Sequence, residues 1–224
     1  MKYLLTSSGV SNTTIRDALV ELLGKPITEC SALIIPTSAY YFLPVGMDIA
    51  YRLISGTAKS PMAELGWKSL GVLELTALPS VKAEQWVPRV RETDALIVGG
   101  GDPQYLCHWM RESGFADLLP TLDETVYVGI SGGSMAVTSS FGETYNDRVV
   151  ATTGSETPLG FIDIAMGVHM DNANMPDNDR DEIANWAASI TVPTYGIDDD
   201  TALKVVDGAI EIITEGHWEL FLNS

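Results

Sequence analysis

Short apolar runs rich in β-branched residues alternate with longer amphipathic segments through the first 140 residues. That alternation is typical of strand-helix-strand units around a parallel sheet. The predicted strands are Tyr3–Thr6, Ala32–Ile35, Ser69–Leu75, Ala95–Val98 and Val126–Ile130. The predicted helices between them are Thr13–Leu23, Val45–Ser55, Ala83–Arg91 and Gln104–Leu118, with Asn12 and Asp102 as caps. We therefore expect an α/β protein with a mostly parallel sheet flanked by helices.

The pattern changes beyond residue 145. Phe161–Met170 is apolar with a polar exit, and Asp179–Ser189 is predicted to be helical. Three short strand-like runs follow, separated by Asp-Gly and Glu-Gly turns: Ala202–Val206, Ile210–Thr214 and Trp218–Leu222. These runs predict an antiparallel meander at the carboxyl end. The sequence contains no linker, so residues 1–224 are expected to form a single domain.

Charge and cysteine content narrow the possible partners and the compartment. Acidic residues outnumber basic ones by 30 to 13, a net charge of −17 that repels phosphate backbones and anionic membranes. Cys30 and Cys107 are too few for a disulfide framework. The amino-terminal apolar stretch is shorter than the roughly 7–15 residues of a signal-peptide core. We expect a cytoplasmic protein that binds neither nucleic acid nor membrane.

The most informative motif lies within Val126–Val137, where an apolar strand runs into G-x-S-x-G and then a helix. This is the context of a nucleophile elbow, in which a strained turn projects the hydroxyl of Ser131 at a helix amino terminus. Unpaired N–H groups there favour a developing negative charge. A phosphate site or a tightly packed turn would use the same glycines. Ser134 is predicted to cap or support the turn.

A second glycine run, Gly99-Gly100-Gly101, follows the predicted strand Ala95–Val98 and opens a helix. Consecutive glycines allow backbone N–H groups to approach a ligand closely, although a tight turn would also use them. Taken with the elbow at Ser131, the run predicts an oxyanion hole. Its donors would be the N–H groups of Gly100, Gly101 and Gly132.

A serine nucleophile needs a base, and the chain has three histidines. His108 falls inside a predicted helix, where packing or a surface role is expected. His169 closes the apolar run Phe161–Val168, at a strand end where active-site residues of open α/β sheets gather. His217 would give the residue order of α/β-hydrolases but belongs to a terminal hairpin. The pattern favours His169.

Three adjacent aspartates, Asp198, Asp199 and Asp200, lie between two strand-like runs. A cluster of this kind is unfavourable by self-repulsion unless its members face solvent, a cation or a histidine. One of them is a candidate for the carboxylate that orients the catalytic imidazole. A solvated turn remains open, and the spacing does not match an EF-hand calcium loop.

Four blocks of the sequence together resemble the serine peptidase family that contains peptidase E and cyanophycinase. They are Leu33-Ile34-Ile35-Pro36-Thr37, Gly99-Gly100-Gly101-Asp102, Gly129-Ile130-Ser131-Gly132-Gly133-Ser134 and Ile197-Asp198-Asp199-Asp200-Thr201-Ala202-Leu203. The resemblance implies a fold like that of class I glutamine amidotransferase domains (flavodoxin-like). It also implies Ser131 as nucleophile, His169 as base and Asp199 in place of the family's usual glutamate. Asp198 is the reserve candidate for that third position.

Several positions near the implied substrate pocket depart from the family or match it weakly. Gly132 replaces a common alanine, and Asp102 replaces a common asparagine. Arg180 lies near where the aspartyl dipeptidase has an arginine for the substrate's acidic side chain, although a surface salt bridge would also explain it. Asn146-Asp147 resembles another pocket pair. Substrate contacts are therefore predicted at Asp102, Asn146, Asp147 and Arg180.

The expected function is hydrolysis of dipeptides or short peptides, with an N-terminal aspartate as one substrate class. No metal or organic cofactor is implied, and the chain is expected to be a monomer or a homodimer. Cleavage of β-aspartyl-arginine, as by cyanophycinase, is the nearest competing hypothesis. An esterase that uses His217 and a non-catalytic protein that binds a small molecule or peptide on the same fold also stay open.

Overall fold

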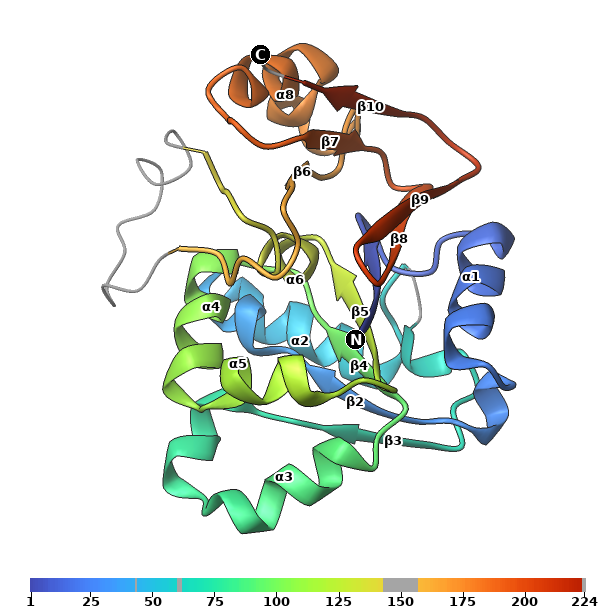
Figure 1. The fold of residues 1–224 in the computed structure, drawn as a ribbon, viewed down its shortest axis with the longest axis vertical. Helices are drawn as coiled ribbons and strands as arrows, with labels where there is room; N and C mark the ends of the chain where they lie inside the picture. Colours follow the sequence, from blue (N-terminus) through green and yellow to red (C-terminus); the bar gives the residue numbers. More distant parts are fainter. Residues whose placement is uncertain (43, 60–61, 143–156, 223–224) are drawn as a thin grey trace.

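A seven-stranded sheet with the order β3-β2-β4-β5-β1-β8-β9 forms the centre of the computed structural model, which describes residues 1–42, 44–59, 62–142 and 157–222. The parallel strands are β1 (Lys2–Thr6), β2 (Ser31–Ile35), β3 (Ser69–Val72), β4 (Ala95–Val98) and β5 (Val126–Ile130). The antiparallel strands are β8 (Thr201–Val206) and β9 (Ala209–Thr214). The predicted mostly parallel α/β fold with antiparallel strands towards the carboxyl end is confirmed (Figure 1).

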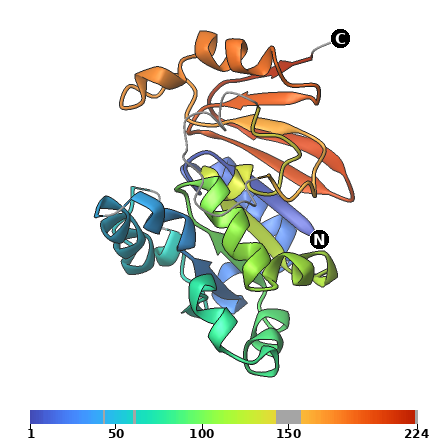
Figure 2. The same cartoon turned by 90° about the vertical axis from the view of Figure 1, so that its left-hand side faces the viewer.

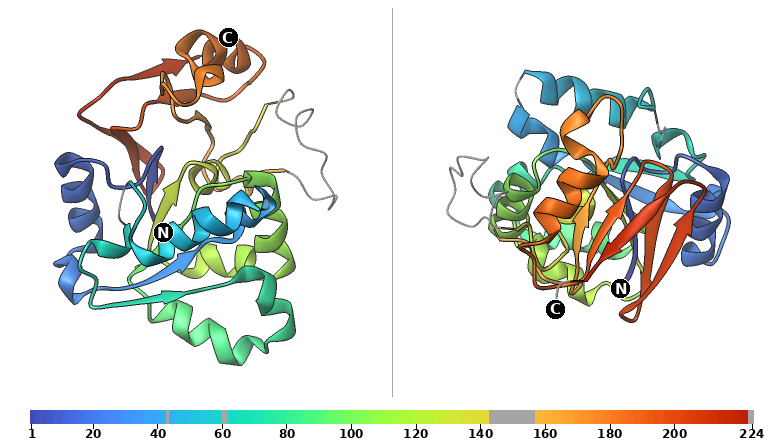
Figure 3. Two further views of the ribbon diagram at one scale, coloured as in Figure 1. Left: turned by 180° about the vertical axis from the view of Figure 1, so that it is seen from behind. Right: turned by 90° about the horizontal axis from the view of Figure 1, so that it is seen from above.

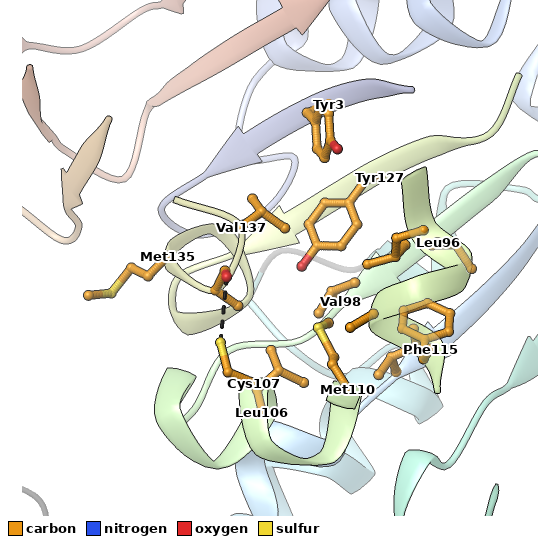
Figure 4. Packing of buried hydrophobic residues seen from close by; sticks show 14 of the residues in the cluster. Tyr3, Leu96, Val98, Leu106, Cys107, Met110, Phe115, Tyr127, Met135 and Val137 are labelled. Atoms are coloured by element: carbon orange, nitrogen blue, oxygen red, sulfur yellow. Dashed lines mark hydrogen bonds between the residues drawn. The ribbon is translucent and has the colours of Figure 1, made fainter. Parts of the chain in front are cut away.

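The sheet separates two hydrophobic cores because successive side chains of a strand point to opposite faces. On β1, Tyr3 and Leu5 lie in one core and Leu4 lies in the other. The helices α3 (Ala83–Arg91), α4 (Pro103–Glu112) and α5 (Phe115–Leu118) cover the first core, shown in Figure 4. The helices α1 (Thr13–Leu23) and α2 (Val45–Ser55) cover the second. Both faces of the central strands β1, β4 and β5 are therefore largely buried, whereas the edge strand β3 is mostly exposed.

One predicted helix, Gln104–Leu118, is broken in the structure. The helix α4 ends at Glu112, and α5 begins at Phe115 after Gly114, which has a left-handed φ of 74°. A second difference is at β3, which ends at Val72 because Leu75–Ser80 turns into a 3-10 helix. The remaining helices of the first 140 residues begin and end where the sequence pattern predicts, with Asn12 and Asp102 as N-caps.

A smaller three-stranded sheet lies beyond the carboxyl ends of the parallel strands (Figures 1 and 2). It contains β6 (Ala165–Gly167), β7 (Thr194–Ile197) and β10 (Trp218–Phe221), and α8 (Arg180–Ala187) packs beside it (Figure 3). Because β10 pairs with β7 and not with β9, the predicted three-stranded meander is wrong for its last strand. The apolar run Phe161–Met170 forms a strand only at β6.

Two turns explain why the chain leaves the large sheet after β9. The N–H of His217 donates to Asp198 Oδ2 at 2.8 Å, and the N–H of Asp198 donates to the His217 carbonyl at 3.2 Å. These bonds fasten the β9–β10 connection to the β7–β8 connection, so β10 enters the small sheet alongside β7. Among the described helices, none is both long and apolar enough to cross a membrane.

Candidate active site

Ser131 occupies a sharp turn between β5 and the short helix α6 (Gly132–Met135), with φ 51° and ψ −117°. Positive φ is uncommon for a residue with a side chain and stores strain of the kind found at functional sites. The glycines that follow allow the turn to press against the end of β4. A β-carbon added at Gly133 would lie 2.2 Å from the Val98 carbonyl oxygen.

The hydroxyl of Ser131 begins a chain of hydrogen bonds through an imidazole to a carboxylate. Ser131 Oγ lies 2.9 Å from His169 Nε2, and His169 Nδ1 lies 2.6 Å from Asp199 Oδ1. With Nδ1–H donating to the carboxylate, Nε2 is left to accept the serine proton. The serine follows β5, the histidine follows β6 and the aspartate lies between β7 and β8. The structure thus brings together the three residues that the sequence singled out.

Asp199 reaches the imidazole although it is one methylene shorter than glutamate. Its neighbour Asp198 faces the other way, where its Oδ1 accepts from Thr201 Oγ1 at 2.6 Å and from the Asp200 N–H at 3.1 Å. The reserve candidate therefore holds the β7–β8 turn, and Asp199 is the aspartate that contacts His169.

The other two histidines lie in different surroundings. His217 is about half exposed, and its ring nitrogens lie 2.9 Å from Asp171 Oδ2 and 2.9 Å from Asp198 Oδ2. His108 lies edge-on against Trp109 on α4, with ring centroids 5.2 Å apart. Neither arrangement supports the residue order of an α/β-hydrolase.

The sequence did not predict two further polar residues around Asp199. Ser7 Oγ donates to Asp199 Oδ1 at 2.8 Å and accepts from the His169 N–H at 2.8 Å. Asn172 Nδ2 donates to Asp199 Oδ2 at 2.6 Å. The bond from His169 lowers the pKa of Asp199 most, and the bonds from Ser7 and Asn172 lower it further against the effect of burial. Ser7 directly follows β1, and that position at a parallel strand end was the available signal.

Ser7→Ala is expected to slow turnover by about five-fold, which corresponds to one lost hydrogen bond worth about 1 kcal/mol. The folded-state pKa of Asp199 is depressed below its ordinary value of 3.8, so the stability it contributes is complete above that pH. The loss of Ser7 Oγ raises this folded-state pKa and reduces the contribution. Kinetics and urea unfolding, compared between wild type and variant across acidic pH, measure both effects.

The part of the Ser7→Ala stability loss that acts through Asp199 should be present at neutral pH. It should disappear as the pH falls through the depressed pKa of Asp199, where the carboxyl is protonated in both states. Ser8→Ala is the matched control, because Ser8 takes no part in the hydrogen bonds around Asp199 described above. A Ser7→Ala loss that is equal at every pH would contradict a role through Asp199.

The predicted oxyanion donors lie beside Ser131. A β-carbon added at Gly100 would lie 3.1 Å from Ser131 Cβ, and one at Gly132 would lie 2.2 Å from the Gly101 carbonyl oxygen. Buried Ser38 fixes the glycine run, since its hydroxyl lies 2.7 Å from the Gly99 carbonyl oxygen and 2.9 Å from that of Gly100. Because of the close approach at Gly132, this backbone has no room for a methyl group at that position.

A cavity of about 640 Å³ opens beside this group of residues, and Ser131, His169, Gly100, Gly101 and Gly132 all contribute to its lining. Its volume is in the range of pockets that bind small ligands. The cavity wall thus combines a hydroxyl, a base and glycine backbone, and acyl transfer requires a nucleophile, a base and backbone donors for the oxyanion. In the described part of the chain, no group of three or more His, Cys, Asp or Glu residues is arranged to hold a metal.

Comparison with protein families shows that residues 3–213 match peptidase family S51. The chain belongs to peptidase family S51. Family S51 is a family of serine-type peptidases. Its similarity to a peptidase E from Nostoc sp. strain PCC 7120 is 25% identity over 131 residues, 55% of this chain and 54% of that relative. The match thus spans about half the length of the curated relative.

Solved structures resemble the S51 chain over nearly its whole length. A protein from Listeria monocytogenes EGD-e, provisionally named as peptidase E, has a TM-score of 0.67 and 16% identity, with 96% of this chain and 98% of that chain covered. A peptidase from an acI-B1 actinobacterium has a TM-score of 0.62 and 19% identity, with 100% and 88% covered. At these identities the likeness concerns the fold.

Two of the predicted substrate contacts, Asp102 and Arg180, lie within the described residues and are engaged elsewhere. Asp102 is buried as the N-cap of α4, its Oδ1 accepts from the Tyr105 N–H at 2.6 Å, and burial raises its pKa. Arg180 is paired with Glu219 and Asp181 on the surface. Among the described residues that line the cavity, neither Asp102 nor Arg180 occurs. Asn146 and Asp147 lie outside the described residues.

Proposed function

We propose that this S51 chain hydrolyses dipeptides or short peptides through an acyl-enzyme on Ser131. His169 Nε2 takes the proton of Ser131 Oγ as the hydroxyl attacks the substrate carbonyl, and Asp199 stabilises the imidazolium that forms. The observation that carries the proposal is the unbroken chain of hydrogen bonds from Ser131 through His169 to Asp199.

The remaining steps use the same residues. The tetrahedral oxyanion is stabilised by backbone N–H groups, and removal of one such donor typically lowers kcat by about 10²–10³-fold. His169 then gives its proton to the leaving amine, the carbon–nitrogen bond breaks and the acyl group stays on Ser131. A water molecule, deprotonated by His169, releases the acid and restores the serine. The donors in this proposal are the N–H groups of Gly100, Gly101 and Gly132.

A fluorophosphonate probe tests the proposal directly, since it reacts with activated serine hydroxyls. We expect one label per chain, located on Ser131 by mass spectrometry and absent in Ser131→Ala. Ser134→Ala is the matched control because Ser134 Oγ is buried and donates to the Thr6 carbonyl at 2.7 Å. If the folded protein takes up no label and releases no amine from a dipeptide library, a non-catalytic binding role replaces the proposal.

A further inference from the structure

Apolar side chains form most of the wall of the cavity beside Ser131. They include Phe42, Ile49, Met135, Met166, Met175 and Trp186. Phe42, Ile49 and Met175 are 46%, 39% and 45% exposed, so they present apolar surface to water. Burial of this surface by an apolar ligand group is favourable, and the unbranched methionines can adjust to its shape.

Two carboxylates, Asp177 and Glu182, are among the described residues that line the cavity. Asp177 and Glu182 are exposed side chains of its lining, and the described lining residues include neither Lys nor Arg. His169 is the one described lining residue able to carry positive charge, and both its ring nitrogens are already hydrogen-bonded within the site. An acidic side chain placed here would meet like charge, whereas an ammonium group would meet opposite charge.

The arginine that resembles a ligand for acidic side chains is engaged elsewhere. Arg180 Nε and Nη2 each donate to Glu219 at 2.7 Å, and Nη1 donates to Asp181 at 2.9 Å. The guanidinium also lies 5.9 Å from the centre of the Phe221 ring. The bidentate bond to Glu219 ties α8 to β10, so Arg180 serves the fold of the small sheet.

From these observations we infer the substrate class of the proposed peptidase, an inference that rests on the proposed function. The cavity takes short peptides with an apolar side chain next to the scissile bond and a free amino group facing Asp177 and Glu182. Peptides with an aspartate side chain in that position are disfavoured. The chain therefore differs in specificity from an aspartyl dipeptidase.

Matched dipeptides test the inference. We expect kcat/KM for Leu-Xaa or Met-Xaa to exceed that for Asp-Xaa by on the order of ten-fold or more, because an unpaired carboxylate is moved towards like charge. Asp177→Lys should reduce the ratio of kcat/KM for Leu-Xaa to kcat/KM for Asp-Xaa by about two- to five-fold, which is the usual strength of an exposed charge contact. Asp17→Lys is the control, since it changes the same charge on α1, away from the cavity lining.

Titration calorimetry of the dipeptides with the Ser131→Ala variant measures the same preference as a difference in binding affinity, without turnover. Tighter binding of Leu-Xaa than of Asp-Xaa, weakened when the leucine amine is acetylated, supports the inference even if hydrolysis is never observed. Labelling of Ser131 together with equal or faster cleavage of Asp-Xaa would overturn the inference and leave the proposed function intact. Binding of neither peptide would also overturn it.

Discussion

Ser131→Ala and His169→Ala are each expected to lower kcat/KM for peptide hydrolysis by on the order of 10⁴-fold or more, with the fold retained. The reason is that the hydroxyl and the imidazole act as one unit: without His169 Nε2 at 2.9 Å, Ser131 keeps its proton and is a weak nucleophile. The double variant should be little worse than either single variant. Steady-state kinetics on one dipeptide, with circular dichroism as the folding check, measure this.

His217→Ala is the matched control for the imidazole. It removes a partly exposed ring paired with Asp171 and Asp198, so a small loss of stability is expected with kcat/KM nearly unchanged. The opposite result, activity retained in His169→Ala and lost in His217→Ala, would mean that the site is arranged as in an α/β-hydrolase.

Gly133→Ala is expected to lower the free energy of unfolding by about 3 kcal/mol or more, because the added methyl group has no room. It would lie 2.2 Å from the Val98 carbonyl oxygen and 2.9 Å from that of Gly99. Both contacts are with backbone, so β4 or α6 must move. For a chain of this size, such a loss lowers the melting temperature by about 6–12 °C, which scanning calorimetry measures.

The matched control for crowding is Gly114→Ala, at the left-handed break between α4 and α5. No heavy atom lies within 4 Å of a β-carbon added at Gly114, so only the left-handed conformation is penalised, by roughly 1–2 kcal/mol. If Gly133→Ala proves no more destabilising than Gly114→Ala, the turn after Ser131 is less tightly packed than described.

The parallel core was predictable because its signals are local. Each of β1, β2, β4 and β5 is a short apolar run, and each reads as a strand without knowledge of its neighbours. The pairing of β10 was not predictable in this way. It depends on Asp198 binding the backbone of His217, a contact between two turns that the spacing of apolar residues does not reveal.

The candidate site likewise contains residues that the sequence predicted and residues that it did not. Ser131, His169 and Asp199 were singled out from glycine content, strand ends and a resemblance. Ser7 was missed because a serine after the first strand carries no motif of its own. Arg180 was misleading for a physical reason: its sequence position gives no sign of Glu219, the partner 39 residues away that occupies its guanidinium.

The hydrogen bond between Ser7 and Asp199 spans 192 positions of the chain. During translation Ser7 and Ser131 leave the ribosome before Asp199, and β8 must emerge before it can pair with β1. A nascent chain that has not yet reached residue 199 therefore lacks the carboxylate that hydrogen-bonds to His169.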